Sequence, residues 1–422
     1  MTRASPLRVL KNAAGSAQVG ARSVLRRADF RRPVAPKLDI AIYTELDAVE
    51  DAWRRFSNVA DCTAFQSFDW LAAWHRHIGA RNDVLPVIVV GSYARGGIAF
   101  IMPLAVEKTR LARKLCWLGQ ELCDYTAPLL ARDFSRRVPP ERFRALWREL
   151  LQRLQRDPRT RHDVIALEKM PHQIGGQSNP FTALQVTANP SGAHLTHLGD
   201  DWQTFYFDKR SSATRRHDRA KRRRLGEFGD VRFVHGRDGD DARHMLDALM
   251  QQKSRSLASR GVCNVFARPG CREFFLELAT NPKTRHLIHL SRIEVGSVWA
   301  AINLGIVFGD CYYHVVASYT DGGISRYGPG ALHLRELMAH AIGLGLRRFD
   351  FTIGDERYKL EWADTHLALC DHVVAATWRG RPISACRNAQ NRIKRAIKQT
   401  PAAWRLLCAA RMALAGLRRV PQ

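Results

Sequence analysis

Hydrophobic and polar positions follow the same order in two separate parts of the chain. In each part, apolar and aromatic residues at helical spacing come first, and three β-branched runs joined by Gly-containing turns come next. This order predicts a helix followed by an antiparallel meander with hairpin connections. The helical stretches are residues 65–79 and 271–279. The strand-like runs are residues 84–91, 97–106, 114–119, 286–293, 298–308 and 311–318.

A second helix then leads each part into one further strand. Residues 140–157 precede the strand-like stretch 163–170, and residues 330–345 precede the stretch 347–355. The section between the two parts, residues 170–195, is rich in Gly, Pro, Asn and Ser and is typical of a connection. The fold class predicted is therefore α+β, with two mostly antiparallel sheets flanked by helices. We expect the two similar domains to span residues 38–190 and 191–378.

Positive charge is concentrated at the two ends of the chain and in one segment of the second domain. The chain has 422 residues and a formal net charge of +26, of which residues 1–37 carry +8, residues 209–224 carry +8 and residues 379–422 carry +11. The rest of the chain is nearly neutral, so the basic segments indicate contact with an anionic surface, such as acidic lipid or another polyanion.

The two basic ends differ in pattern. We expect residues 1–37 to form a disordered arm, because they are rich in Ala, Gly, Ser and Arg and lack periodicity. Such an arm serves solubility, or acts as an organelle transit peptide. Residues 379–422 predict a basic helical arm that docks on the body or lies on a membrane surface, and docking is the simpler expectation.

Several classes of protein and site are disfavoured. The nine cysteines form no Cys-x-x-Cys pair and no Cys/His group with zinc-ligand spacing, so we expect reduced thiols, a cytoplasmic location and no metal. No apolar stretch reaches the roughly 18–20 residues that a membrane-spanning helix needs, although the basic ends leave peripheral contact with the inner face of a membrane open. A serine nucleophile-elbow motif is also missing, which disfavours covalent catalysis.

A Gly-rich stretch, Ser325 to Leu334, lies between a predicted strand and a predicted helix. Gly328 and Gly330 allow the backbone to approach a ligand closely, and the intervening proline suits the first turn of a helix. The amides of Ala331 and Leu332 would then point along the helix axis, where a phosphate binds. A plain helix cap that needs glycine for its conformation fits the same residues.

Charged residues crowd the stretch "FDFTIGDERYKLEW", residues 349–362. Strand alternation places Asp350 on the face opposite Phe349 and Phe351, and a buried carboxylate there needs a cation, such as Arg357 or Lys359, or a cleft. A carboxylate or histidine at such a cleft can act as a general base. A local salt-bridged turn is the alternative for the charged residues that follow the strand. The candidates for proton transfer are Asp350, Asp355, Glu356, Tyr358, Lys359 and His314.

Other residues are candidates for the same site. His314, in the strand-like run 311–318, is either an alternative base or a hydrogen-bonded core residue. A strand amide near Val316 to Ser318 would stabilise an oxyanion. Asp69, Trp70 and Tyr125 of the first domain would reach a cleft between the domains.

The order of strand, Gly-rich loop, helix and acid-bearing strand resembles the GNAT-type N-acyltransferases. It is most similar to the CelD-like acetyltransferases associated with cellulose and exopolysaccharide synthesis, which show a Tyr-x-x-Gly loop followed by an "FDFxxGDExYKxxW" signature. Here these motifs read Tyr327 to Gly330 and residues 349–362, and the likeness covers about residues 38–375. The wider superfamily has Gln or Arg where this chain has Ser325, with Arg326 one place later.

The resemblance implies a function and a co-substrate. It implies two tandem GNAT-like domains with acetyl-CoA or another acyl-CoA as donor. The first half has no Gly-x-Gly loop before its helix, so we expect one donor site, in the second domain. The acyl group would pass by direct attack on the thioester to an amine or hydroxyl of a sugar, a polysaccharide unit or a small metabolite. The implied donor-binding residues are Val316, Ser318, Arg326, Tyr327, Gly328, Gly330, Ala331 and Leu332.

Two other functions stay open. The tandem layout is also similar to the Fem-type ligases, which use aminoacyl-tRNA, and the basic segment 214–224 suits either an RNA donor or the 3′-phosphate of coenzyme A. Outside that alternative we expect no specific nucleic acid. The third possibility is a non-catalytic basic binding module on a GNAT-like scaffold.

Overall fold

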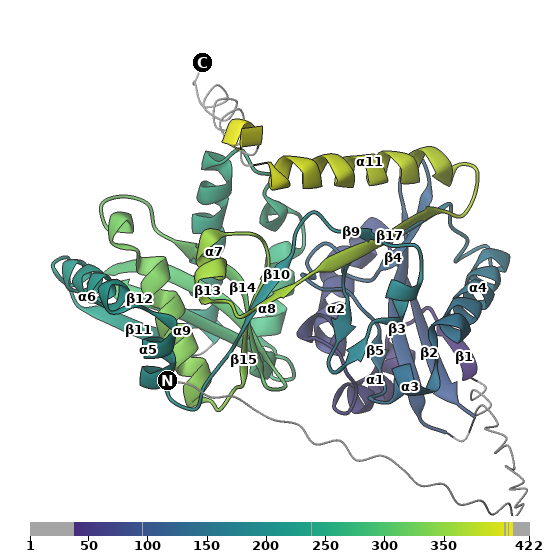
Figure 1. Cartoon of the computed structure of the whole chain (residues 1–422), viewed down its shortest axis with the longest axis horizontal. Coiled ribbons are helices and arrows are strands. Elements are labelled where there is room, and N and C mark those ends of the chain that lie inside the picture. The colour runs from purple at the N-terminus through teal and green to yellow at the C-terminus, as the bar shows by residue number, and fades with distance from the viewer. Residues whose placement is uncertain (1–37, 95, 238, 401, 404, 408–422) are drawn as a thin grey trace, which may run out of the picture. The chain divides into compact units, whose positions relative to one another are not determined.

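The first of the two large sheets is built mainly from the N-terminal half of the chain. The computed structural model describes residues 38–94, 96–237, 239–400, 402–403 and 405–407, so the arm expected over residues 1–37 lies outside the described residues. The strand order of this sheet is β1-β2-β3-β4-β6-β17-β9, and the short β5 pairs with β3 (Figure 1). Its strands are β1 (Leu38–Tyr43), β2 (Leu85–Tyr93), β3 (Ile98–Lys108), β4 (Arg113–Trp117), β5 (Leu129–Leu130), β6 (Val164–Pro171), β9 (Thr187–Ala188) and β17 (Leu369–Ala375).

The second sheet has the order β11-β12-β13-β14-β15-β10-β16. Its central strands follow the predicted runs closely, because β-branched side chains alternate along them and glycines with positive φ, Gly296 and Gly309, make the two hairpin turns. Its strands are β10 (Ala193–His197), β11 (Val231–His235), β12 (Ile288–Val295), β13 (Val298–Phe308), β14 (Cys311–Tyr319), β15 (Arg348–Ile353) and β16 (Thr365–Leu367). A separate two-stranded ribbon consists of β7 (Gln173–Ile174) and β8 (Gln177–Ser178).

The two sheets share one topology. Each is antiparallel except for one parallel pair, which is β4–β6 in the first sheet and β14–β15 in the second. A crossover helix joins each parallel pair: α4 (Pro140–Arg156) in the first and α9 (Pro329–Gly343) in the second. The predicted α+β class with two mixed sheets flanked by helices is confirmed.

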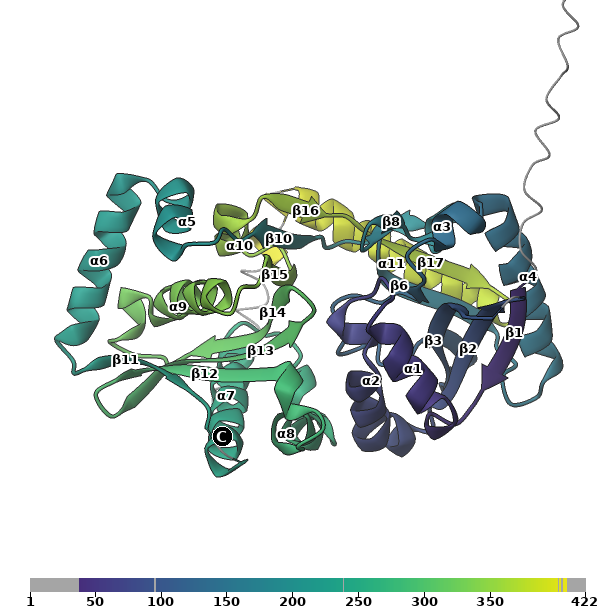
Figure 2. The ribbon, with the colours of Figure 1, turned by 90° about the horizontal axis from the view of Figure 1, so that it is seen from below.

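Helices cover both faces of each sheet. In Figure 2, α9 lies on one face of the second sheet, and α7 (Gly239–Ser259) and α8 (Cys271–Thr280) lie on the other. In the first half, α4 packs on one face, and α1 (Glu50–Ser57) and α2 (Phe68–Trp74) pack on the other. The further α-helices are α3 (Phe134–Arg137), α5 (Trp202–Lys209), α6 (Ser212–Gly226), α10 (Arg357–Trp362) and α11 (Gly380–Gln399).

One hydrophobic core includes residues from both halves. Trp70 of α2 makes an edge-to-face contact with Phe274 of α8, with ring centroids 4.9 Å apart. Phe65 contacts Tyr313 of β14 in the same way at 5.8 Å. Such aromatic pairs contribute beyond their buried area, so the two halves stabilise each other.

The C-terminal region crosses to the first half. Strand β17, which lies within the predicted second domain, pairs antiparallel with β6 of the first sheet, and α11 packs on both strands. Docking on the body is therefore found for residues 380–399, while most of the apolar pattern at 404–417 lies outside the described residues. The limits 38–190 and 191–378 stay a prediction.

No helix in the described ranges is long and apolar enough to cross a membrane. The eight cysteines that the structure describes are free thiols.

Candidate active site

Strands β14 and β15 separate part-way along their length. They pair in parallel from Cys311 and Arg348 as far as Tyr313 and Asp350, and beyond that point each strand continues alone on this side. A β-bulge at Val315 bends β14 where the two strands diverge, because Leu304 and Gly305 of β13 oppose Val316 and His314. Backbone pairing between the two strands therefore ends beside Asp350, and the space between them beyond this point is called the gap below.

Asp350 is buried, at 3% exposure, without a cation in direct contact. Its Oδ1 accepts hydrogen bonds from Tyr125 Oη and from the amide of Thr352, both at 2.7 Å. Burial raises the pKa of Asp350 to about 7, although these two hydrogen bonds oppose the rise. A carboxyl group with this pKa accepts or releases a proton near neutral pH, as a general base must.

The charges of Asp124 and Lys359 act on Asp350, and those of Lys169 and Lys253 act on Asp124. Burial raises the pKa of Asp124, and the charge of Lys169 opposes this rise most strongly. Lys359 Nζ donates to the carbonyl of Ile353 at 2.7 Å, and Lys253 Nζ donates to the carbonyl of Ala317 at 3.1 Å. Burial lowers the pKa of Lys253. The site therefore combines carboxyl groups that resist ionisation with cations that offset negative charge.

Thr352 has a strained backbone at this point. Its φ of 60° is unusual for a β-branched residue, and it follows a bulge in β15 where His194 and Leu195 oppose Thr352 and Asp350. The strained conformation lets the Thr352 amide reach Asp350, and the Thr352 hydroxyl donates to the carbonyl of His314 across the gap at 3.3 Å. Strain of this kind commonly lies at functional sites.

The Gly-rich loop differs in detail from the expectation. The amides of Ala331 and Leu332, expected to be unpaired, both donate to the carbonyl of Gly328 at 3.1 Å, because the helix begins one residue earlier, at Pro329. The Tyr319 side chain favours glycine at position 330, because an added Cβ would lie only 3.2 Å from the Tyr319 ring. At Gly328, whose φ is 66°, an added Cβ would make only ordinary van der Waals contacts, none closer than 3.7 Å.

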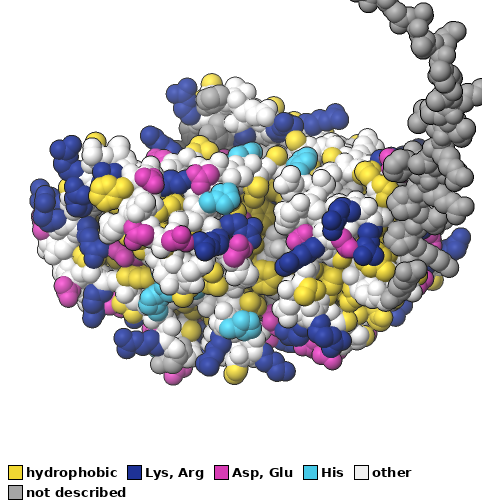
Figure 3. Space-filling model, turned by 60° about the horizontal axis from the view of Figure 1, so that its bottom comes forward, with side chains coloured by type: hydrophobic (Ala, Val, Ile, Leu, Met, Phe, Trp, Pro, Cys, Tyr) yellow, Lys and Arg dark blue, Asp and Glu magenta, His cyan; other side chains and the backbone are white. Residues whose placement is uncertain are grey.

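A lysine of the basic helix α6 lies beside this loop. An added Cβ on Gly328 would be 3.8 Å from Lys221 Nζ, and the structure gives Lys221 no hydrogen bond or ion pair with any described residue. Exposed Arg219 and Arg223 belong to the same helix. Figure 3 shows dark-blue Lys and Arg side chains gathered at the end of the body that carries α6. Lys221 thus places a positive charge beside the start of α9, even though the helical amides there are paired.

The other residues proposed for proton transfer have varied surroundings. Asp355 pairs with Lys398 of α11 at 2.8 Å, which gives it a docking role instead. Exposed Glu356 pairs with buried Lys359 at 3.1 Å, so part of the salt-bridged turn considered above is present. Burial lowers the pKa of His314 to about 3, which makes it a weak base, and the Tyr358 ring lies 6.3 Å from the His314 ring. Of the proposed set, Asp350 has the chemistry of a base.

The remaining donor-site candidates lie around the gap and the loop. Val316 and Ser318 pair regularly with β13, so the irregular position on β14 is Val315, one residue before the range expected to hold an oxyanion donor. The Ser318 hydroxyl donates to Gln252 at 2.8 Å. The Arg326 guanidinium stacks on the Tyr327 ring at 4.9 Å, at the end of the Gly-rich loop.

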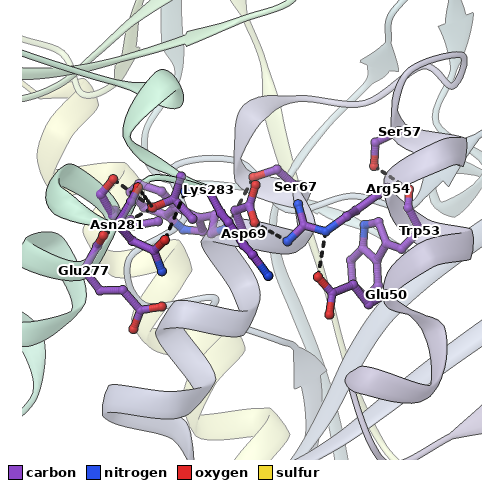
Figure 4. A network of polar contacts seen from close by, with 12 residues as sticks. Glu50, Trp53, Arg54, Ser57, Ser67, Asp69, Glu277, Asn281 and Lys283 are labelled. Atoms are coloured by element: carbon purple, nitrogen blue, oxygen red, sulfur yellow. Dashed lines mark hydrogen bonds and ion pairs between the residues drawn. The ribbon is translucent and has the colours of Figure 1, made fainter.

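Of the three first-half residues expected to reach a cleft, only Tyr125 contacts Asp350. Asp69 accepts from Arg54 at 2.5 Å, and Arg54 also pairs with Glu50, as Figure 4 shows. Trp70 lies in the shared hydrophobic core.

The comparisons with known proteins agree with this geometry. Residues 212–360 match the profile of the acetyltransferase (GNAT) domain, a range that includes α6, the Gly-rich loop and Asp350. This part of the chain is similar to GNAT acetyltransferase domains. The matched range excludes Tyr125 and Asp124, so the first half supplies two side chains to the environment of the GNAT domain's buried carboxyl group. No curated protein matches the chain in sequence.

Solved structures extend the similarity to both halves. FemX matches with a TM-score of 0.54 at 9% identity, over 82% of this chain and 99% of FemX. A conserved protein of unknown function from Bacteroides thetaiotaomicron matches with a TM-score of 0.51 at 12% identity, over 80% of this chain and all (100%) of that chain. A tandem GNAT protein from the clavulanic acid biosynthesis pathway matches with a TM-score of 0.41 at 9% identity, over 80% of this chain and 98% of that chain. At these identities the likeness concerns the fold alone, and the expected likeness to GNAT proteins and to FemX is confirmed.

Three residues of the site were not singled out from the sequence. Asp124 directly precedes Tyr125, which was named, so the neighbouring acid was a signal that could have been used. Lys169 has a positive φ of 63° and Lys253 lies within an ordinary amphipathic helix, and neither feature marks a site in a sequence.

Proposed function

We propose that the chain is an acyl-CoA-dependent acyltransferase in which Asp350 is the general base. The observation that carries this proposal is the divergence of β14 and β15 beside a buried carboxyl group whose pKa is about 7. The GNAT domain match supports an acyl donor of the coenzyme A type.

The start of α9 is our proposed contact for the donor's phosphates. Lys221 has no anionic partner among the described residues and faces the Gly328 backbone, so a phosphate there would gain a charge-assisted hydrogen bond. The positive end of the α9 dipole adds to the attraction. The thioester would then lie in the gap between β14 and β15, next to the bulge at Val315.

The acceptor would enter from a polar cavity of about 450 Å³ that Ile353 of β15 lines together with residues of the first half and α11. Its lining also carries basic side chains, among them Arg387, which pairs with Glu168. The amides and carboxylates of the lining offer hydrogen-bonding groups for the hydroxyls of an acceptor. They are Gln120, Glu168, Asn189, Asp371 and Asn391. A saccharide or another small polyhydroxylated acceptor fits this chemistry.

The reaction needs two proton transfers, one from the attacking acceptor and one to the leaving thiolate. The acceptor amine or hydroxyl attacks the thioester carbonyl carbon and gives its proton to the Asp350 carboxylate. The new C–N or C–O bond forms as the C–S bond breaks, and the thiolate leaves with compensation from Lys253 or Lys359 until it is protonated. Tyr125 holds the Asp350 carboxyl group in place for the first transfer.

The donor site is tested with Lys221→Ala and a matched control, Arg223→Ala, which removes an exposed charge from the same helix. Titration calorimetry should show that Lys221→Ala weakens coenzyme A binding by about 5–30-fold, as expected for loss of a charge-assisted hydrogen bond. The control should bind within about twofold of wild type. Neither variant should alter binding of acyl-pantetheine, which lacks the nucleotide phosphates.

Free-thiol release from acetyl-CoA across a panel of amines, amino sugars and oligosaccharides tests turnover. No release with any acyl-CoA and no change in melting temperature with coenzyme A would contradict the proposal. A salt-sensitive complex with charged tRNA, under the same conditions, would favour the Fem-like alternative instead.

A further inference from the structure

Three histidines that are distant in the sequence converge on the second sheet. His235 ends β11, His289 lies near the start of β12 and His340 lies in the last turn of α9. One ring nitrogen from each lies within 4.8 Å of the other two. The His289 and His340 rings stack with centroids 4.5 Å apart, and the His235 ring lies 4.6 Å from His340.

The hydrogen bonds within the histidine cluster do not provide a partner for every ring nitrogen. His235 Nδ1 and His289 Nε2 are 2.8 Å apart and can share only one proton. The side chain of His340 has no hydrogen-bond partner among the residues that the structure describes, although its ring faces the other two. Three imidazoles that face one another this closely cannot all be protonated, because like charges repel.

His289 has a hydrogen-bond partner on the side of its ring that faces away from the cluster, as a metal-binding histidine commonly does. His289 Nδ1 lies 2.8 Å from Tyr312 Oη, which also accepts from Asn303 Nδ2 at 2.9 Å. If His289 donates its Nδ1 proton to this hydroxyl oxygen, its Nε2 lone pair points into the cluster, as in metal sites whose ligands are held by a second hydrogen bond. The C-terminal end of α9, where His340 lies, favours a cation through the helix dipole.

We propose that His235, His289 and His340 bind a divalent transition-metal ion, with Zn²⁺ as the preferred ion. Three imidazole nitrogens suit Zn²⁺, Ni²⁺ or Cu²⁺, and the set contains no oxygen ligand of the kind that Mg²⁺ and Ca²⁺ require. In a tetrahedral site with Zn–N bonds of about 2.0–2.1 Å the nitrogens lie about 3.3 Å apart, so shifts of a few tenths of an ångström to about 1.5 Å in side-chain position suffice. Water would fill the fourth position.

Such an ion would join the edge of the sheet to a helix. Strand β11 is the edge strand of the second sheet, and the three ligands come from β11, β12 and α9. Because α9 also begins at the proposed donor site, the ion would fix the position of the helix against the strands. The three histidines are too far apart in the sequence to form a metal-binding motif, which is why the sequence predicts no metal.

Metal content and affinity test the proposal. The protein, without a polyhistidine tag and treated with EDTA, is titrated with Zn²⁺ by calorimetry, and bound metal is counted by plasma mass spectrometry. We expect one ion per chain, a higher melting temperature with Zn²⁺, and a visible absorption spectrum of tetrahedral Co²⁺ when cobalt replaces zinc. His235→Ala and His340→Ala should each weaken binding by about 100-fold or more, since each loses a ligand.

His286→Ala is the matched control, because His286 is exposed and lies three residues before His289. It should keep one ion per chain and the same affinity. Less than one ion per wild-type chain, or equal affinity in wild type and in the His235→Ala/His340→Ala double variant, would overturn the proposal. The outcome is independent of the acyl transfer proposed above, because no measurement uses an acyl donor.

Discussion

Asp350 combines two properties that pull stability and activity in opposite directions. Its carboxyl group is buried, and its pKa of about 7 lies well above the ordinary value of 3.8. The folded protein therefore holds a proton that the unfolded chain releases as the pH rises from about 4 to about 7. Asp350 favours the folded state least above pH 7, where a base must be ionised.

Asp350→Asn is expected to separate these two properties. Turnover should fall by about 100-fold or more, because the amide cannot accept a proton. Since the amide is never ionised, the variant should become more stable than wild type, by up to about 4 kcal/mol, as the pH rises from 4 to 8. Urea denaturation at a series of pH values measures the difference.

Asp355→Asn is the control for this substitution, because Asp355 pairs with Lys398 at the surface. It should keep its turnover and the pH dependence of wild type. Equal turnover in Asp350→Asn and wild type would remove Asp350 from the mechanism.

Tyr125→Phe is expected to shift the pH at which the enzyme becomes active. The hydrogen bond from Tyr125 lowers the pKa of Asp350 against the effect of burial, so its loss raises that pKa further. The rising limb of the kcat/KM profile should move to higher pH, with turnover recovering at high pH. Tyr93→Phe is the control, because the Tyr93 hydroxyl donates to a different carboxylate, that of Asp133. This variant should leave the profile unchanged. A uniform loss of rate without this shift would assign Tyr125 a purely structural role.

At the scale of elements, Gly328 at the beginning of α9 has two possible roles, which are to form the turn and to leave room for a ligand. Gly328 has φ of 66° with no atom closer than 3.7 Å to an added Cβ. Gly328→Ala should therefore cost about 1–2 kcal/mol from backbone strain alone, and Gly328→Asn should cost less, because Asn tolerates this conformation. Chemical denaturation measures both. If Asn keeps stability but lowers coenzyme A affinity, the glycine serves the ligand as well as the turn.

Strands and helices were predictable where one pattern determines them. The runs 298–308 and 311–318 match β13 and β14 within one residue, since alternation and the Gly309 turn are local signals. The partner of Asp350 was not determined locally, because Tyr125 lies 225 residues away and is brought to it only by the packing of the two halves. Asp355 adjoins the signature, which makes it a candidate from the sequence, and the structure pairs it with Lys398 of α11.

Helix α11 is expected to be part of the stable fold. Arg387 makes two hydrogen bonds to Glu168, at 2.5 and 2.7 Å, and Asn391 donates to Asp371 at 2.9 Å. Glu168 and Asp371 are both buried, so removing α11 would leave two carboxyl groups without these partners. Truncation after residue 378 should cost about 3–5 kcal/mol or prevent folding, whereas truncation after residue 400 should change the melting temperature by only a few degrees.

Arg387→Ala gives a finer test of the same point. Arg387→Ala should lower the free energy of unfolding by most of the amount that truncation after residue 378 costs. Arg392→Ala, at an exposed position on the same helix, should have little effect on this free energy. Equal stability of the two truncated chains would show that α11 adds nothing to the body.

At the scale of the whole molecule, the two sheets depend on each other. The seven-residue strand β17 follows the second sheet in the chain but pairs with β6 along the first, from Leu369 opposite Pro171 to Ala375 opposite Val164. The shared core adds aromatic contacts between α2 and α8. A fragment of residues 38–190 would therefore expose one side of β6 as an unpaired edge and uncover the apolar surface of α2.

We expect residues 38–400 to unfold in a single transition, with equal calorimetric and van't Hoff enthalpies, because the first sheet takes β17 from the second half and the two halves share one hydrophobic core. The fragment 38–190 should show no cooperative melting and should bind a dye specific for exposed apolar surface. Joining residues 368–400 to that fragment through a flexible linker should restore part of the transition by returning β17 and α11 to β6. Two separate transitions in the long chain, or cooperative melting of the short fragment, would mean that the halves are independent domains that merely exchange a strand.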